Sequence, residues 1–321
     1  MAKSRRAWLL AALALLASPA AADPALTAKF DAYLQPTLDA GRFSGAILVT
    51  QAGAVVFDKA YGMADRERGI ANRTSTSFHI GTLSMQYTAA AVMLLVETHR
   101  LSLDNTVAQL VPGVAYGDRI TIRDLLGGSL DVPTVPQSYA LLARIVEADT
   151  GKPLADVLDA DFLGPLFLTG SGLDDGTLGD ESRMAHGYAP DGADGLKPAE
   201  PVQWAARTGE GSAYTTTRDE LRWIEAFFAG HIVSAASRQA MLDGSKAPGG
   251  YGWTAYPGLG EPAYGAAGTA PGFAAFAVHL PASDVTVVVL GNSESASVVR
   301  RLGKDLALLA AGRPLPPPTA D

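Results

Sequence analysis

Strand-like segments lie near both ends of this chain, and the long region between them has mostly helical patterns. Residues 44–50 and 54–60 flank a short turn that contains Gly53, which predicts a β-hairpin. Two further strands are predicted at 273–280 and 285–290. Because a two-stranded hairpin alone is only marginally stable, we expect the strands from the two ends to share one sheet. The helical middle is then an insertion, and the groove between sheet and insertion is the natural pocket.

The pattern of apolar residues separates a central strand from the helices around it. The run at 285–290 has no polar alternation, which is typical of a strand covered on both faces. Pro36 lies within the first predicted helix and is expected to kink or restart it. Thr217 is expected to cap the helix that follows it. The predicted helices span residues 26–40, 84–98, 139–149, 217–229 and 295–311.

The composition allows a sizeable core, since 48% of the 321 residues are hydrophobic and only 18% are charged. The formal charge is −8, and no cluster of lysine or arginine follows the N-terminal region. Such a chain is a poor candidate for binding nucleic acid or an anionic membrane. The absence of cysteine excludes disulfides and lipid attachment at a processed N-terminus.

The first 22 residues have the pattern of a secretory signal peptide. Basic residues within positions 3–6 precede an apolar run at 7–17, and small residues at 18–22 offer a cleavage site before Asp23. The alternative is an uncleaved membrane anchor, for which the apolar run is short. Cleavage after Ala22 would remove three basic and no acidic residues and change the formal charge from −8 to −11. We therefore expect a periplasmic or secreted mature protein.

These patterns also predict the organisation of the whole chain, which has no internal repeat. A tail with four prolines after residue 312 is expected to be disordered. The expected segments are the signal peptide 1–22, one domain over 23–311 with sheet parts at about 23–75 and 245–311 and a helical insertion at about 76–244, and the tail 312–321.

The stretch FHIGTLSMQYTAAAV, residues 78–92, has the pattern of a loop that ends at the first turn of a buried helix. Many hydrolases place a nucleophile at such a position, with a base one helical turn later. The candidate nucleophile here is Thr82. Three residues on stands Met85, whose thioether cannot take a proton.

Five segments in this order resemble the serine β-lactamase and penicillin-binding-protein-like family, especially its class C, esterase and D-aminopeptidase branch. The resemblance covers residues 43–292 and implies an α/β (α+β) fold of the β-lactamase/transpeptidase type. In that fold an antiparallel sheet built from N- and C-terminal strands is flanked by helices, with a mostly helical inserted region. The similar segments are FSGAILVTQAGAVVFDKAYGMADRERGIANRTSTSFHIG, LSLDNTVAQLVP, ITIRDLL, GSAYTTTRDELRW and YGAAGTAPGFAAFAVHLPASDVTVVVLGN.

The resemblance implies a Ser-x-x-Lys pair at the start of the buried helix, where the lysine accepts the proton of the serine. Those two positions fall on Thr82 and Met85. The family's Tyr-x-Asn element falls on Thr134, Val135 and Pro136, so neither phenol nor amide is present. A segment that relatives carry just before Thr134, and that walls their groove, is missing.

The third family element, Lys-Thr-Gly or His-x-Gly on the strand that faces the nucleophile, falls on Ala266, Ala267 and Gly268. An alanine methyl group contributes no charge to the site. The family's oxyanion hole uses backbone N–H groups, which the resemblance places on Thr82 and Thr269. Backbone donors persist whatever the side chains are, so the hole can outlast the other elements.

Each candidate nucleophile has a structural alternative. Thr82 suits an ordinary helix N-cap, which we favour in the absence of a base. Ser84 is a second candidate, but its base would be Tyr87, whose pKa would have to be strongly depressed. Tyr139 stands close to the missing tyrosine and is better explained by packing. Lys246, in a Gly/Pro-rich loop, is expected to be solvated.

The sequence predicts no cofactor and no metal site. The histidines are scattered, without an i, i+4 pair or a cysteine partner, which argues against zinc. Acidic loops at Asp174-Asp175 and at Asp191 and Asp194 lack the spacing of a calcium-binding EF-hand, and turn chemistry explains them better. The five histidines are His79, His99, His186, His231 and His279.

Three functional hypotheses follow from these residues. The first is a secreted, catalytically degenerate relative of the serine hydrolases that binds a peptide, a peptidoglycan fragment or another protein in the former groove. The second is a weak esterase, amidase or β-lactamase-type enzyme that uses Thr82 or Ser84. The third is a structural or partner-binding periplasmic domain whose groove is filled, with Met85 and Pro136 as the expected plugs. An open pocket at Thr82, Ala266 and Gly268 would favour the first two.

Overall fold

A computed structural model describes residues 24–128, 134–178, 183–192, 195–244, 247, 250–293 and 295–317. The predicted signal peptide and the last four residues of the predicted tail lie outside the described residues. No helix among the described residues is both long and apolar enough to cross a membrane.

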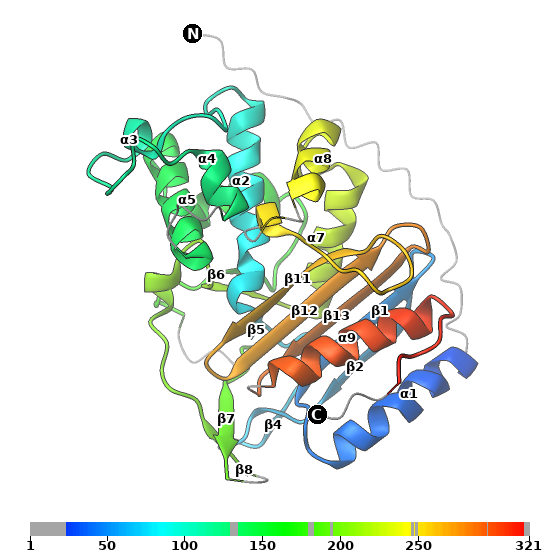
Figure 1. The fold of residues 1–321 in the computed structure, drawn as a ribbon. Helices are drawn as coiled ribbons and strands as arrows, with labels where there is room; N and C mark the ends of the chain where they lie inside the picture. Colours follow the sequence, from blue (N-terminus) through cyan, green and yellow to red (C-terminus); the bar gives the residue numbers. More distant parts are fainter. Residues whose placement is uncertain are drawn as a thin grey trace.

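The described residues form one six-stranded antiparallel sheet with the order β10-β11-β12-β13-β1-β2 (Figure 1). The sheet places strands from the two ends of the chain side by side, since β1 pairs with β13. This confirms that the terminal strands share a sheet. The strands are β1 (Gly45–Gln51), β2 (Ala54–Tyr61), β10 (Thr254–Ala255), β11 (Tyr264–Ala270), β12 (Phe273–Leu280) and β13 (Val285–Gly291).

The predicted hairpin is present as β1 and β2. Its two-residue turn has a left-handed backbone at both positions, with φ of 49° at Ala52 and 73° at Gly53. Such turns match the twist of the flanking strands, which explains why a short connection containing glycine suffices here.

Strand β13 is covered on both faces, as its lack of polar alternation predicted. Val287 and Val289 belong to one hydrophobic core, and Val288 and Leu290 belong to the other. Helices α1 (Pro24–Asp39) and α9 (Ala296–Ala310) cover the first face, while α7 (Thr217–Ala229) packs against β13 and β1 on the second (Figure 1). The sheet therefore divides the interior into two cores.

The second core continues into a mostly helical region between β2 and β10, which agrees with the expected insertion. Its central element is the buried helix α2. The further helices are α2 (Met85–Glu97), α3 (Val107–Leu110), α4 (Ile122–Gly127), α5 (Val135–Thr150), α6 (Leu154–Leu158) and α8 (Ala235–Gly244), with short helical turns η1 (Gly81–Ser84), η2 (Asp159–Leu163), η3 (Trp204–Arg207) and η4 (Gly250–Gly252). The short strands are β3 (Met63–Asp65), β4 (Ile70–Ala71), β5 (Phe78–His79), β6 (Gly172–Leu173), β7 (Tyr188–Asp191), β8 (Gly195–Pro198) and β9 (Ala213–Thr215).

One helix interior and two helix starts differ from the predictions. Helix α1 continues through Pro36 instead of restarting there. The N-cap of α7 is Thr216 rather than Thr217, because the Thr216 hydroxyl accepts a 3.1 Å hydrogen bond from the Asp219 N–H. Helix α5 begins at Val135, four residues before the predicted start, since proline in a first helical turn sacrifices no intrahelical hydrogen bond.

Candidate functional site

The short turn η1 is pressed against the edge of strand β11. Gly81 has a left-handed backbone (φ 52°), and a β-carbon there would lie 2.2 Å from the carbonyl oxygen of Thr269. A β-carbon on Gly268 would lie 1.8 Å from the carbonyl oxygen of Ile80. Both distances lie far inside van der Waals contact, so this close approach requires glycine on both sides.

Thr82 lies half-buried inside this turn, and its Oγ1 donates a 3.2 Å hydrogen bond to the carbonyl oxygen of Ala267. Helix α2 begins three residues later, at Met85, so Thr82 is not its N-cap. The interpretation of Thr82 as an ordinary helix cap is therefore wrong. The turn that begins at Gly81 brings the Thr82 hydroxyl to the edge of a strand and not to a helical N–H group.

The position one helical turn after Thr82 holds no proton acceptor. Met85 is buried and belongs to the hydrophobic core of the helical region. Among the described residues, no titratable side chain hydrogen-bonds to the hydroxyl of Thr82 or of Ser84. Among these residues, no side chain is bonded so as to activate either hydroxyl as a nucleophile.

Ser84 is fully engaged in local structure. Its side chain is 2% exposed, its hydroxyl donates to the carbonyl oxygen of Gly81, and it accepts a 3.3 Å hydrogen bond from the Ala213 N–H. Tyr87 does not meet the condition for serving as its base, because burial raises the pKa of the Tyr87 phenol instead of lowering it.

A buried polar cluster that the sequence analysis missed lies beneath this turn. The Tyr87 hydroxyl donates to one carboxylate oxygen of Glu220 (2.7 Å), and the Gln86 amide donates to the other (2.6 Å). All three side chains are at most 2% exposed. Burial raises the pKa of Glu220 to about 7, although these two hydrogen bonds act in the opposite direction. Glu220 precedes Trp223, Ile224 and Phe227 at helical spacing, which was the available signal that it faces the core.

His79 is the titratable residue nearest to Thr82 along the chain. It is buried, and its ring stacks on Trp204 with centroids 3.6 Å apart. Its Nε2 lies 3.4 Å from Oδ2 of Asp174. Burial, with a smaller effect of Arg207, lowers the pKa of His79 to about 3. His79 therefore stays neutral, and its ring is engaged by Trp204 and Asp174.

The positions of the second family element form the start of helix α5. The Thr134 N–H and hydroxyl both contact Oε1 of Gln137, at 3.1 and 3.0 Å, which satisfies the helix end. Pro136 is exposed, so it does not plug a pocket. Tyr139 is completely buried, and its hydroxyl lies 3.4 Å from the carbonyl oxygen of Leu126, which confirms its packing role. Lys246 lies outside the described residues.

The structure does bring the turn and the facing strand together. Ala267 and Thr269 present their peptide groups on the same strand edge, since alternate residues of a strand share an edge. The Thr82 hydroxyl meets the first of these groups, and Gly81 lies against the second. Ala266 is buried and faces the helical core with Gly268. The backbone of Thr269 is thus adjacent to the turn that carries Thr82.

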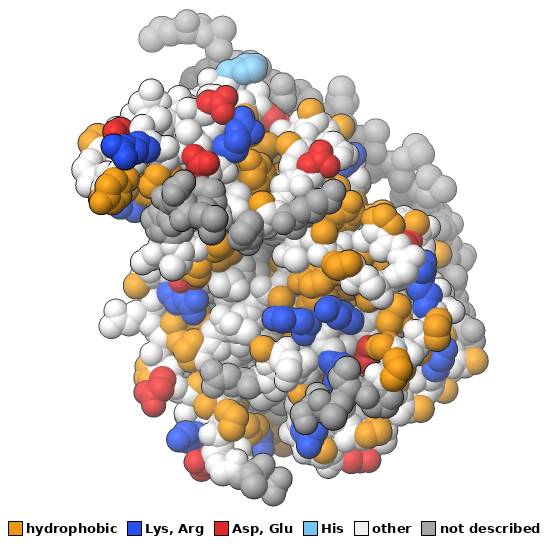
Figure 2. Space-filling view, viewed as in Figure 1, with side chains coloured by type: hydrophobic (Ala, Val, Ile, Leu, Met, Phe, Trp, Pro, Cys, Tyr) orange, Lys and Arg blue, Asp and Glu red, His pale blue; other side chains and the backbone are white. Residues whose placement is uncertain are grey.

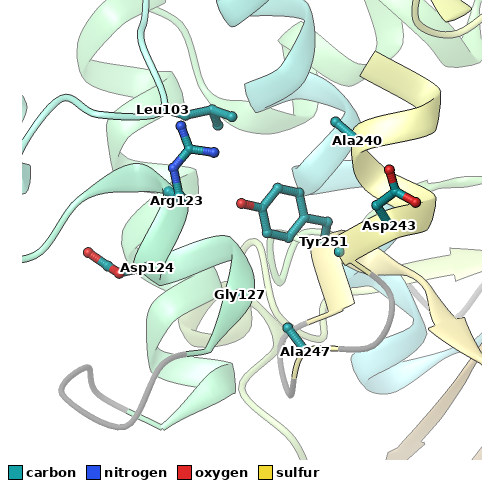
Figure 3. A pocket seen from close by; sticks show the side chains of 9 residues that line it. Leu103, Arg123, Asp124, Gly127, Ala240, Asp243, Ala247 and Tyr251 are labelled. Carbon is teal, nitrogen blue, oxygen red and sulfur yellow. The ribbon is translucent and has the colours of Figure 1, made fainter. Parts of the chain in front are cut away.

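A cavity of about 460 Å³ lies in the helical region and is not lined by Thr82, Ala266 or Gly268 (Figure 3). It lies between α4, α8 and η4, and its wall is mainly apolar. Its lining includes Leu103, Arg123, Gly127, Ala240, Gly244 and Tyr251.

Metal-ligand side chains gather at one place among the described residues. Single ligand atoms of Asp65, Glu67 and His186 lie within 4.8 Å of one another. Asp65 is already paired with the N–H and guanidinium groups of Arg68, and Tyr188 donates to Glu67 at 2.6 Å. These hydrogen bonds explain the clustering of Asp65, Glu67 and His186 by local structure.

The acidic loop at 174–175 forms turns, as expected. Asp174 accepts from the Gly176 N–H at 2.8 Å, and Asp175 accepts from the Thr177 N–H at 2.9 Å. Asp191 lies 3.9 Å from Lys197, and Asp194 lies outside the described residues. On the face drawn in Figure 2, lysine and arginine side chains are scattered among acidic and hydrophobic ones.

The sheet of terminal strands, the helical insertion and the turn at the head of α2 together define an α+β protein of the β-lactamase/transpeptidase type. A family model described as Beta-lactamase matches residues 30–312. The chain belongs to this family.

Two curated relatives and one solved structure show the range of similar proteins. "Putative penicillin-binding protein PbpX" of Bacillus subtilis is 24% identical over 285 residues, which cover 79% of this chain and 71% of that protein. "Teichoic acid D-alanine hydrolase" of Staphylococcus aureus is 26% identical over 224 residues, covering 60% of this chain and 55% of that protein. The octameric penicillin-binding protein homologue from Pyrococcus abyssi matches with a TM-score of 0.80 at 22% identity, over 89% of this chain and 77% of its own. That structural likeness supports the fold.

Proposed function

We propose that this chain is a secreted, catalytically degenerate member of the β-lactamase family that acts by binding. The observation that carries the proposal is the environment of Thr82. Its hydroxyl donates to a backbone carbonyl, and the position of the activating base holds the buried Met85. A hydroxyl without a proton acceptor is a poor nucleophile, and an oxyanion hole alone stabilises an anion that nothing generates.

The ligand class of this proposal is a peptide, a peptidoglycan fragment or another protein of the cell envelope. It is supported by the names of the relatives, which refer to penicillin binding and to hydrolysis of D-alanine from teichoic acid. The chain spans little more than half the length of the second relative. The activities in these names therefore only guide the choice of ligand class.

A weak hydrolase is the second candidate, and one observation favours it. Thr82 is only half-buried, and the backbone of Thr269 lies beside its turn, as an oxyanion hole made of their two N–H groups would require. Ser84 is a weaker candidate, because its hydroxyl is buried and already bonded on both sides.

We expect no covalent adduct when the purified protein is incubated with a penicillin or with an activated phosphonate. Intact-mass spectrometry measures this directly, with a relative that retains Ser-x-x-Lys as the positive control. Thr82→Ala and Ser84→Ala are the matched variants. A stoichiometric adduct that disappears in one of them would identify a working nucleophile and replace the binding proposal with the hydrolase.

Secretion makes a separate prediction. Expressed in a Gram-negative host, the chain should be recovered outside the cytoplasm with Asp23 as its first residue, because residues 7–17 and 18–22 supply the apolar run and the cleavage site. N-terminal sequencing checks this. Recovery of the full-length chain in the membrane fraction would instead indicate the uncleaved anchor.

A further inference from the structure

The cavity between α4, α8 and η4 holds two hydrogen-bond donors that point toward one another. In Figure 3 the Arg123 guanidinium and the Tyr251 hydroxyl approach each other from opposite walls. The guanidinium charge acts to lower the pKa of the Tyr251 phenol, although burial, the larger effect, raises it, so the phenol keeps its O–H as a donor.

Tyr251 is held in an unusual backbone conformation. Three consecutive residues are left-handed, with φ of 63° at Gly250, 48° at Tyr251 and 80° at Gly252. Such a backbone is uncommon for a residue with a side chain and is energetically unfavourable. A β-carbon on Gly244 would lie 2.7 Å from the tyrosine ring, so this wall is built to accommodate the ring. Strained residues of this kind are concentrated at binding sites.

The ion pair between Arg123 and Asp104 is weak. Its Nε and one terminal nitrogen contact a single oxygen of Asp104, at 3.2 and 2.8 Å. The side chains of this pair are 52% and 76% exposed, so the pair is screened by water and is worth little. A ligand carboxylate can therefore compete for Arg123.

The two carboxylates of the lining serve other partners. Asp124 bonds to Thr121 in the cap of α4 and points away from the cavity in Figure 3. Asp243 is exposed and accepts from Gln239 at 3.1 Å. Arg123 and Tyr251 thus contribute donors to the cavity, while Leu103 and Ala240 supply an apolar wall.

We propose that this cavity binds a small carboxylate with a short apolar body, whose oxygens are held by the Arg123 guanidinium and the Tyr251 hydroxyl. A planar carboxylate matches the fork of a guanidinium, and the apolar body fits the alanine- and leucine-lined wall. The inference rests on the proposed binding role, but the pocket shares no residue with the turn that carries Thr82.

The test is a titration of the folded protein with isobutyrate, with isobutyramide as the uncharged isostere, followed by protein-observed NMR. We expect isobutyrate to bind at least about tenfold more tightly than the amide. Arg123→Ala and Tyr251→Phe should each weaken isobutyrate binding, and thermal unfolding checks that both variants are folded. Asp104→Asn should tighten binding about threefold, because it removes the competing carboxylate.

Equal binding of acid and amide would overturn the proposal, as would an isobutyrate affinity unchanged by Arg123→Ala or by Asp104→Asn. A purely structural role of the Arg123–Asp104 pair predicts no gain of affinity in Asp104→Asn. Thr82→Ala should leave isobutyrate binding intact. The two proposals therefore fail separately: a covalent adduct at Thr82 removes the degenerate reading, whereas loss of acid selectivity removes only the carboxylate pocket.

Discussion

Replacing Glu220 by glutamine is expected to stabilise the protein at pH 8 by about 3 kcal/mol while leaving it nearly unchanged at pH 4.5. The wild-type carboxyl group is completely buried, and burial raises its pKa to about 7 from an ordinary value of 4.5. Because the folded state binds this proton more tightly than the unfolded state, the stabilisation is fully present below pH 4.5. It is lost as the pH rises through about 7, where folding must bury a charge.

Glutamine has nearly the same shape and carries no charge. Its carbonyl oxygen can accept from Tyr87, and Gln86 can turn its amide to accept from the new NH₂ group. The measurement is the free energy of unfolding in urea between pH 4.5 and 8 for the wild type and for Glu220→Gln. The difference between the two proteins is compared across this range, because the contributions of the other carboxyl groups cancel in it. Glu200→Gln, the same substitution at an exposed glutamate, is the matched control. A difference that stays flat across this range would contradict the raised pKa.

Gly268→Val is expected to lower the free energy of unfolding by about 3 kcal/mol or more. A β-carbon at this position would lie 1.8 Å from the carbonyl oxygen of Ile80 and 2.5 Å from the backbone nitrogen of Leu83. Both neighbours are main-chain atoms, so no side chain can move aside, and the turn must separate from β11.

Thr269→Val is the matched control, because it places the same side chain one residue further on the same strand. Thr269 is exposed, and valine suits a strand, so the expected change is within about 0.5 kcal/mol. Denaturant unfolding of both variants gives the comparison. Similar stabilities for the two valine variants would show that the turn does not pack against Gly268 as described.

This second prediction bears on what a surviving motif residue means. Gly268 keeps the glycine of the third family element, while Ala266 stands where the family has its lysine or histidine. The contact with Ile80 explains that glycine by packing alone. Its presence is therefore no argument for catalysis.

The sequence predicted those parts of the fold whose signal is local. The hairpin of β1 and β2 follows from a short glycine-containing turn, and the two-sided burial of β13 follows from its unbroken apolar run. The cap of α7 was misplaced by one residue because three threonines stand in a row at 215–217, and only one hydroxyl faces Asp219. The start of α5 was hidden because Val135 and Pro136 are poor helix formers in isolation.

The site was less predictable because its contacts are distant in sequence. The approach of Gly81 to Thr269 and the bond from Thr82 to Ala267 join segments almost two hundred residues apart. No pattern near Thr82 shows that a strand edge will receive its hydroxyl. The same holds for Glu220, whose buried face was visible in the helical spacing of α7 but whose partners on α2 were not.

The contact between η1 and β11 also bears on solubility. Strand β10 pairs with β11 only at residues 264–265, so the peptide groups that follow lie on an outer edge of the sheet. An open strand edge is a template for pairing with another chain, and proteins commonly cover such edges. Here the Thr82 hydroxyl occupies the carbonyl of Ala267, and Gly81 lies over Thr269. By covering this edge, the turn disfavours edge-to-edge aggregation. This role would constrain the residues of the turn even in a protein that turns over no substrate.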